Sequence, residues 1–134
     1  MEIKEILDNY NNIAVVGMSK HLEKPAFTVP SYMKKQGYKI IPVNPTIDSI
    51  MKLQTYKNLM DVPDYIEIVL VFRPSSEALD IVKEAIERKK IKNDIKVIWL
   101  QLGIINNEAK TIAEQEGIDF VQDKCIYVEH KNYL

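Results

Sequence analysis

Residues 13–17 read Ile-Ala-Val-Val-Gly, four apolar residues in a row followed by a glycine. A short apolar run that ends at a glycine is typical of a strand buried on both faces of a parallel sheet. Residues 26–36 can form a helix that ends at Gly37, and residues 38–43 form a second, largely apolar strand. This stretch therefore predicts a β-α-β unit whose two strands run parallel. Pro30 fits this helix only in its first turn, where the missing N–H costs little.

The alternation of strands and helices continues along the rest of the chain. Apolar runs predict strands and amphipathic stretches predict helices, with Asn106 as a candidate N-cap and Gly117 as a helix stop. The expected elements are strands at 53–56, 66–72, 95–100 and 118–121, and helices at 2–10, 75–90, 106–116 and after residue 123. Of these, the strand at 53–56 is a short one at the edge of the sheet.

This pattern predicts an α/β fold, a doubly wound and mostly parallel sheet in the order 3-2-1-4-5-6. Right-handed crossovers place its helices on both faces. Such sheets bind ligands outside the carboxyl ends of their strands, at the point where the strand order reverses. That point lies between the first and fourth strands, so we expect a crevice between the loop after Gly17 and the loop after Phe72.

Length and charge narrow the classes of function. The 134 residues correspond to one domain, which excludes most two-domain dehydrogenases, kinases and ligases. The 18 basic and 19 acidic residues leave a net charge of −1, so nucleic acid is not the expected partner. The one basic run, Arg88-Lys89-Lys90 with Lys92, ends a predicted helix, and its lysines are interpreted as complementing the helix dipole.

The chain also lacks the signals of export and membrane insertion. No apolar run approaches the roughly 18 residues that a membrane-spanning helix needs, and the N-terminal residues carry acids without an apolar signal region. A single cysteine, Cys125, cannot form an internal disulfide. Together these features predict a cytoplasmic protein without a membrane partner.

The loop after the first strand is the strongest candidate for an anion site. Gly17 allows a sharp turn and a close approach of a ligand to the backbone, and Ser19 offers a hydroxyl and a backbone N–H. The following helix has no acid in its first turn, so its dipole attracts anions. Lys20 and Lys24 add positive charge, which favours a phosphate here. The alternative is that Gly17 serves only as a turn between strand and helix.

Two other loops reach the same crevice. Asn44 can hydrogen-bond a ribose or a base edge, and Pro45 can pack against an adenine, although Asn-Pro is also an ordinary turn. Arg73 can pair with a phosphate, or it is simply an exposed surface arginine. Trp99 is expected in the core, and Gln101 either reaches the ligand or satisfies a loop.

The common nucleotide motifs are absent. The dinucleotide fingerprint would need glycines at positions 19 and 22, which are Ser and Leu, and an acid after the second strand, which is missing. There is no Walker A motif either. NAD binding in the usual way is therefore disfavoured.

No arrangement of residues predicts catalysis or a metal site. His21 and His130 are the only histidines, and their spacing suits no metal. A nucleophile cluster can be drawn from Asp123, Cys125, Glu129 and His130, but spacing places no histidine beside the cysteine. A lone cysteine is more often a small buried apolar residue than a nucleophile.

Several segments resemble the small CoA-binding-domain proteins, single-domain relatives of the nucleotide-binding part of the succinyl-CoA synthetase α subunit. The specific ones are Pro-Val-Asn-Pro at 42–45 and Trp-Leu-Gln-Leu-Gly at 99–103, and the resemblance covers nearly the whole chain. The other matching segments are 16–19, 24–25, 37–38, 71–74, 107–109, 123–126 and 129–130.

The resemblance implies one Rossmann-like domain over residues 1–134 that binds coenzyme A, and it assigns ligand-binding roles to the three loops. The residues that it places at the phosphates are Gly17, Met18, Ser19 and Lys24, with Lys20 adding charge in the same loop. Those at the adenosine end are Val43, Asn44 and Pro45. Those at the pantetheine or pyrophosphate side are Phe72, Arg73 and Pro74. Family members often carry a second basic residue where this chain has Pro74, which weakens the phosphate contacts expected there.

We therefore expect a module that binds coenzyme A or an acyl-CoA, with no autonomous catalytic site. The synthetase α subunit carries a phosphorylated histidine in a further domain, and neither histidine of this chain aligns with it. One alternative is a CoA-carrying subunit of an acyl-CoA synthetase or transferase, which implies a protein partner. Less favoured alternatives are an NAD(P)-binding oxidoreductase and a sensor in which Cys125 forms a mixed disulfide with CoA.

Overall fold

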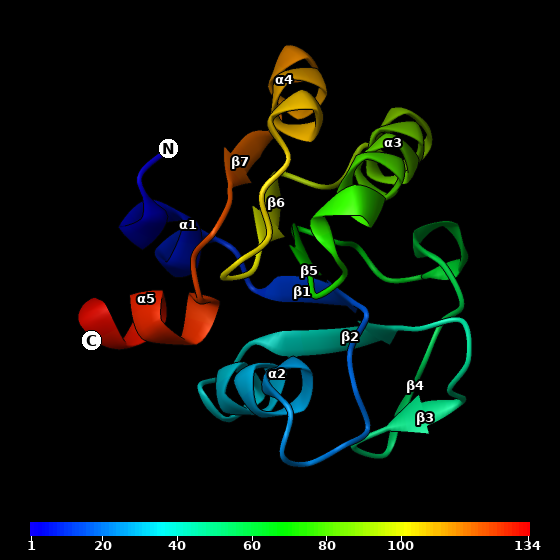
Figure 1. Ribbon diagram of the computed structural model, residues 1–134, viewed down its shortest axis with the longest axis vertical. Helices are drawn as coiled ribbons and strands as arrows, with labels where there is room; N and C mark the ends of the chain where they lie inside the picture. Colours follow the sequence, from blue (N-terminus) through cyan, green and yellow to red (C-terminus); the bar gives the residue numbers. More distant parts are fainter.

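The computed structural model describes residues 1–134, and a five-stranded parallel sheet forms its centre (Figure 1). Its strands lie in the order β2-β1-β5-β6-β7. Their bounds are β1 Asn12–Val16, β2 Lys39–Val43, β5 Ile68–Val71, β6 Val97–Leu100 and β7 Asp119–Val121. The predicted order is confirmed for these five strands, and the order reverses between β1 and β5 as expected.

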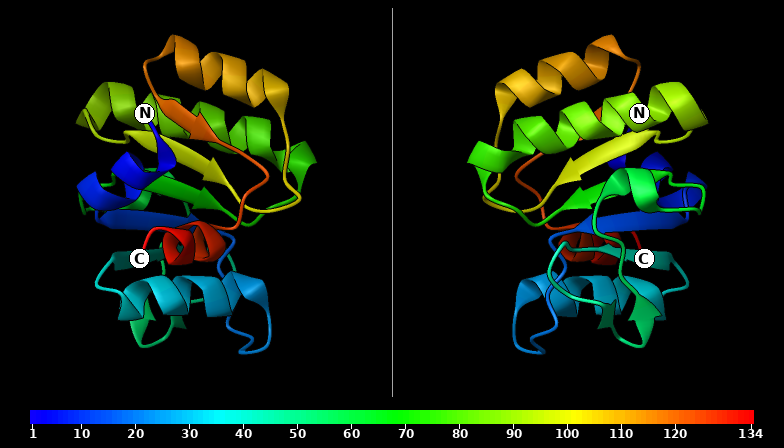
Figure 2. Two further views of the ribbon diagram at one scale, coloured as in Figure 1. Left: turned by 90° about the vertical axis from the view of Figure 1, so that its left-hand side faces the viewer. Right: turned by 90° about the vertical axis from the view of Figure 1, so that its right-hand side faces the viewer.

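Helices cover both faces of the sheet, as the sequence predicts (Figure 2). The helices on one face are α3 (Ser75–Lys92) and α4 (Asn107–Gln115). Those on the other face are α1 (Ile3–Asn9), α2 (Pro25–Lys35) and α5 (Ile126–Asn132). None of these helices combines the length and the apolar character that crossing a membrane requires.

The apolar run in β1 divides its side chains between two cores. Ile13 and Val15 pack on the face of α1, α2 and α5, whereas Ala14 packs on the face of α3 and α4. This alternation explains why the run contains no polar residue, because both faces of a central parallel strand are buried. Trp99 belongs to the core as predicted: it is fully buried, and its Nε1 donates to the carbonyl of Lys124 at 2.8 Å.

The third predicted strand is reduced to a single bridge. Tyr56 pairs with Val43 at the edge of β2, donating to Pro42 O at 3.0 Å and accepting from Asn44 N at 2.8 Å. The preceding residues instead form a separate antiparallel hairpin of β3 (Ser49–Ile50) and β4 (Leu53–Gln54).

The prediction for Pro30 is wrong. α2 begins at Pro25, so Pro30 is the sixth residue of the helix and lies in the second turn. The proline suited to the first turn is Pro25, at the position where an N–H has no helical partner. Pro30 therefore leaves the carbonyl of Ala26 without its helical donor.

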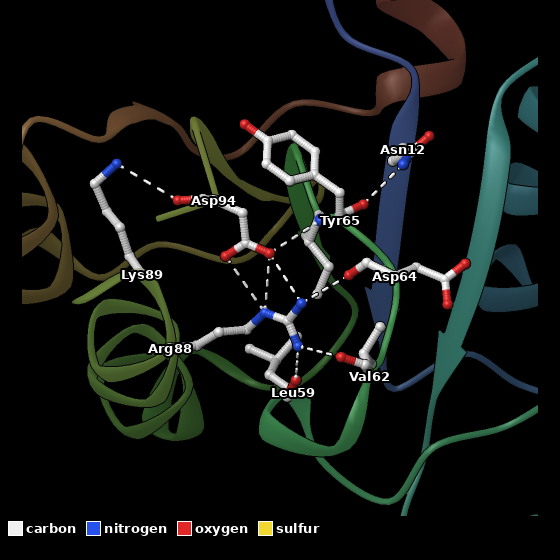
Figure 3. Close-up of polar contacts among 9 residues, drawn as sticks. Asn12, Leu59, Val62, Asp64, Tyr65, Arg88, Lys89 and Asp94 are labelled. Carbon is white, nitrogen blue, oxygen red and sulfur yellow. Dashed lines mark hydrogen bonds and ion pairs between the residues drawn. The ribbon is translucent and has the colours of Figure 1, made fainter. Parts of the chain in front are cut away.

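The lysines of the basic run lie in the last turn of α3, as predicted, but the burial of its first residue, Arg88, was not predicted. Arg88 is fully buried and pairs with the equally buried Asp94 at 2.9 Å (Figure 3). Its guanidinium also donates to three backbone carbonyls, those of Leu59, Val62 and Asp64, at 2.6–2.7 Å. The arginine thereby joins α3 to the chain that runs from the 3-10 helix η1 (Leu59–Asp61) into β5.

Candidate functional site

A cavity of about 310 Å³ lies where the strand order reverses, at the carboxyl ends of β1 and β2 and beside α3. Five of the predicted ligand residues line it: Gly17, Val43, Asn44, Pro45 and Arg73. They come from the loops after β1, β2 and β5, which are far apart in the sequence. The parallel sheet brings these loops to one edge, which is the expected position of a ligand site.

Gly17 allows the loop after β1 to lie against the loop after β5. Its backbone has a φ of +85°, a conformation that residues with a side chain rarely adopt. A Cβ at this position would lie 2.7 Å from Cδ of Arg73 and 3.1 Å from the carbonyl oxygen of Phe72. The glycine is therefore needed both for the turn and for the close packing of Arg73 beside it.

Arg73 is paired with a carboxylate within the cavity wall. Its Nε and Nη2 donate to the two carboxylate oxygens of Glu77, at 3.1 and 2.8 Å. Both side chains are about half exposed, so the pair adds little to stability. The remaining guanidinium nitrogen, Nη1, has no hydrogen-bond partner in the protein. The pair with Glu77 thus holds the Arg73 side chain while leaving one donor group unused.

Asn44 connects two of the loops around the cavity. Its Nδ2 donates to the carbonyl of Met18 at 3.0 Å, and its Oδ1 accepts from the backbone N–H and hydroxyl of Thr46, both at 2.9 Å. The Asn-Pro turn that the sequence left open is thus a turn whose side chain also fixes the loop after β1. These bonds occupy the side-chain amide of Asn44, so fewer of its donors and acceptors remain for a ligand.

The loop after β1 is folded by its own hydrogen bonds. Ser19 N donates to Ala26 O at 3.1 Å, and Ser19 Oγ accepts from His21 N at 3.0 Å. The hydroxyl hydrogen of Ser19 has no acceptor in the protein and is free to bind a ligand, whereas the backbone N–H of Ser19 is already bonded to Ala26. The prediction that both groups of Ser19 are available is therefore only half met.

The N-terminus of α2 has the charge environment that the sequence predicts. Its N-cap, Lys24, makes no side-chain capping bond, and no acid lies in the first turn. Few backbone donors remain, because Pro25 has none and Phe27 and Thr28 both donate to Lys24 O at 2.9 Å. The groups that remain to bind an anion here are the N–H of Ala26 and the exposed side chains of Lys20 and Lys24.

The remaining predicted ligand residues do not line the cavity. Met18 is fully buried, and its side chain packs in the core beside α1, α2 and α5. Phe72 packs partly against the same core, and Pro74 is the exposed N-cap residue of α3. Ser19, Lys20 and Lys24 lie on the loop that leads from the cavity to α2.

Sequence reasoning missed more than half of the cavity wall. The additional lining residues are Val16, Thr46, Lys57, Asn58, Glu77, Ile81 and Glu84. Three of them, Glu77, Ile81 and Glu84, recur at helical spacing in α3. This spacing was the signal that could have identified the face of the helix that lines the cavity. Lys57 and Asn58 directly follow the bridge at Tyr56, so they also lie at the carboxyl end of an edge segment.

Glu84 is a half-buried carboxyl group in the cavity wall. Partial burial raises the pKa of its carboxyl above the usual range, and hydrogen bonds from the backbone of Leu59 and Met60 oppose that shift. The nearby carboxylates of Asp61 and Glu87 raise the pKa further. Glu84 therefore resists ionisation more than an exposed glutamate does.

The residues of the alternative nucleophile cluster have separate partners. Asp123 accepts from Gly103 N at 2.7 Å, and His130 Nδ1 is hydrogen-bonded to the hydroxyl of Tyr32 at 2.9 Å. Cys125 is half-buried at the start of α5. Gln101, which could have served either a ligand or a loop, accepts from Ile126 N at 3.2 Å and so fixes the start of α5.

The chain is similar in sequence and in fold to known proteins. A family model described as "CoA binding domain" matches residues 11–131. The uncharacterized protein YneT of Bacillus subtilis is 38% identical over 129 residues, which cover 96% of this chain and 92% of that protein. A solved structure from Thermus thermophilus superimposes with a TM-score of 0.91 at 32% identity and covers 100% of both chains.

A more distant relative is an enzyme of much greater length. An ADP-forming acetate–CoA ligase of Methanocaldococcus jannaschii is 25% identical over 119 residues, which cover 86% of this chain and 17% of the ligase. The likeness therefore concerns one part of that enzyme. With the matched model spanning most of its residues and with the sheet described above, this chain belongs to the CoA-binding-domain family, whose fold is Rossmann-like.

Proposed function

We propose that the protein binds coenzyme A or an acyl-CoA in the cavity at the carboxyl ends of β1 and β2, as a single binding domain over residues 1–134. The observation that carries this proposal is the convergence of three loops with family-like motifs on one cavity. The motif loops follow β1, β2 and β5. The family membership of the chain supports coenzyme A as the ligand.

In this proposal the adenosine lies against the loop after β2. Val43, Pro45 and Ile81 provide apolar surface in the cavity wall, which suits the face of a purine. The polar groups beside them, including Asn58 and Thr46, suit a ribose or a base edge. The cavity wall thus combines apolar surface with polar groups that can fix the orientation of a bound ligand.

The phosphates then lie along the line from Arg73 to the N-terminus of α2. Arg73 has a free Nη1, Ser19 a free hydroxyl hydrogen, and Lys24 an exposed ammonium group. Lys57 is the one cation in the cavity wall without an ion pair. We assign it to the 3′-phosphate, the group that distinguishes coenzyme A from its dephospho form.

A change at Ser19 tests where the phosphates bind. Ser19→Glu places a carboxylate beside them without touching the core, and a like charge within ~5 Å should weaken binding by about tenfold or more. The matched control is Thr111→Glu, the same change of charge on the exposed surface of α4. Both variants are titrated with CoA by calorimetry. Equal affinity in the two variants would show that the phosphates bind elsewhere.

A second candidate function follows from the ligase relative. The chain corresponds to 17% of the length of that enzyme, so it can act as the CoA-carrying subunit of an acyl-CoA synthetase whose other groups come from a partner. Tagged protein from native cells is tested for acyl-CoA formation that depends on an acyl acid, ATP and CoA. Activity that is present with the wild-type protein and lost with Ser19→Glu supports this role. Inactive complexes, or activity that survives the substitution, contradict it.

A further inference from the structure

Pro30 interrupts the hydrogen bonds of α2 at a place that matters for the loop after β1. In a continuous helix, the N–H of residue 30 would donate to the carbonyl of Ala26. Pro30 has no N–H, and a proline ring crowds the carbonyl four residues earlier and turns it away from the helix axis. The Ala26 carbonyl accepts instead from Ser19 N at 3.1 Å.

This bond fastens the loop after β1 to the helix that follows it. Ser19 lies seven positions before Ala26 and comes two residues after Gly17, which lines the cavity. On its other side, the loop is held by the bond from Asn44 Nδ2 to Met18 O at 3.0 Å. Two neighbouring residues of the loop are thus anchored in opposite directions, one to the loop after β2 and one to α2.

We infer that Pro30 is a positioning residue for ligand binding, acting through the carbonyl of Ala26 on the backbone of Ser19. It is buried in the face of α2 that packs on the sheet, so it does not itself touch the cavity. The inference rests on the proposed function, because its effect on affinity requires CoA to bind beside this loop. It also specifies that the Ser19 hydroxyl and the Ala26 N–H, and not the Ser19 N–H, are the donors offered to a phosphate.

Two substitutions restore the missing N–H and so test the inference. Pro30→Ala removes part of the buried ring, whereas Pro30→Val keeps most of its volume. In both variants the new N–H competes for the Ala26 carbonyl, and hydrogen exchange at the Ser19 amide should accelerate. CoA affinity should fall by about fivefold, the equivalent of one neutral hydrogen bond. The thermal midpoint of Pro30→Val should not fall with it, because the helix gains a bond.

The control is Thr111→Ala, at an exposed residue of α4 that does not line the cavity. It should leave both Ser19 exchange and CoA affinity unchanged. Unchanged Ser19 exchange in the Pro30 variants overturns the inference, and so does faster exchange with unchanged affinity. If the wild-type protein itself does not bind CoA, the proposed function fails, while Ser19 exchange still decides whether Pro30 holds the loop.

Discussion

The cavity depends on single residues whose backbone or environment is unusual. Gly17 and Gly103 both have a φ of +85°, yet only Gly17 has neighbours within 4 Å of the place where a Cβ would lie. Substitutions at the two glycines therefore distinguish the cost of backbone strain from the cost of steric crowding. Glu84 is a second such residue, since partial burial raises the pKa of a carboxyl group that lines the cavity.

Gly17→Ala should destabilise the protein more than Gly103→Ala. Both changes carry the strain of a positive φ, but the new methyl group at position 17 must also displace Arg73 and strain its pair with Glu77. Overpacking of this kind should add about 1–3 kcal/mol to the loss of unfolding free energy. Urea unfolding of the two variants measures the difference. Equal losses of unfolding free energy in the two variants would mean that the Arg73 side chain moves aside without cost.

Glu84→Gln should change the dependence of stability on pH. Because the folded-state pKa of Glu84 is raised, the native state holds its proton more tightly than the unfolded chain does. Wild-type stability therefore falls relative to the variant as pH rises from about 4, through the unfolded pKa and then the folded pKa. Unfolding midpoints of both proteins between about pH 4 and 7 test this. Glu114→Gln, the same substitution at an exposed position on α4, is the control.

At the scale of elements, the buried pair of Arg88 and Asp94 holds η1 and the start of β5 against α3. Arg88 donates to carbonyls on either side of Pro63, and Asp94 accepts from Ile66 N at 3.1 Å. The segment so held directly follows Lys57 and Asn58, which line the cavity. The network thus supports the candidate site without reaching it.

Arg88→Met should lower the free energy of unfolding by about 3–5 kcal/mol, because it leaves the Asp94 carboxylate buried without its partner. Lys90→Met, two residues along the same helix but exposed, is the control, and it should change stability by less than about 0.5 kcal/mol. Chemical unfolding followed by circular dichroism measures both. Similar small effects in the two variants would contradict a structural role for Arg88.

The elements with strong apolar runs were predictable, and those shaped by local backbone conformation were not. The strands at 13–16 and 40–43 are continuous apolar runs, and residues 17, 44 and 73 follow strands, so topology alone brings them to one edge. The hairpin of β3 and β4 turns at Met51 and Lys52, with φ of 54° and 63°. Neither residue is one of those that favour such a turn, so the sequence carried no signal for it.

Two further misses have a tertiary cause. A run of basic residues at a helix end gives no sign that one of them is buried, because the carbonyls that receive Arg88 come from a distant loop. Pro30 was misplaced because the bond that compensates for it joins Ala26 to Ser19 rather than to the helix. In both cases a contact between separate segments overrides the local preference.

At the scale of the whole molecule, the net charge of −1 conceals an excess of cations around the cavity. Lys57 and Arg73 line the cavity together with two carboxylates, those of Glu77 and Glu84, and Lys20 and Lys24 add positive charge on the loop beside it. A ligand with several phosphates would gain more from this edge of the sheet than a neutral nucleoside would. This charge distribution leads to a ranking of ligands that one experiment can measure.

Calorimetric titration of the purified protein with CoA, dephospho-CoA, NAD and AMP tests the central claim most directly. We predict that CoA binds most tightly, that loss of the 3′-phosphate weakens binding because Lys57 loses its partner, and that NAD binds least well because the loop after β2 has no acid for its ribose. Absence of heat with millimolar CoA, or tighter binding of NAD than of CoA, would contradict the account.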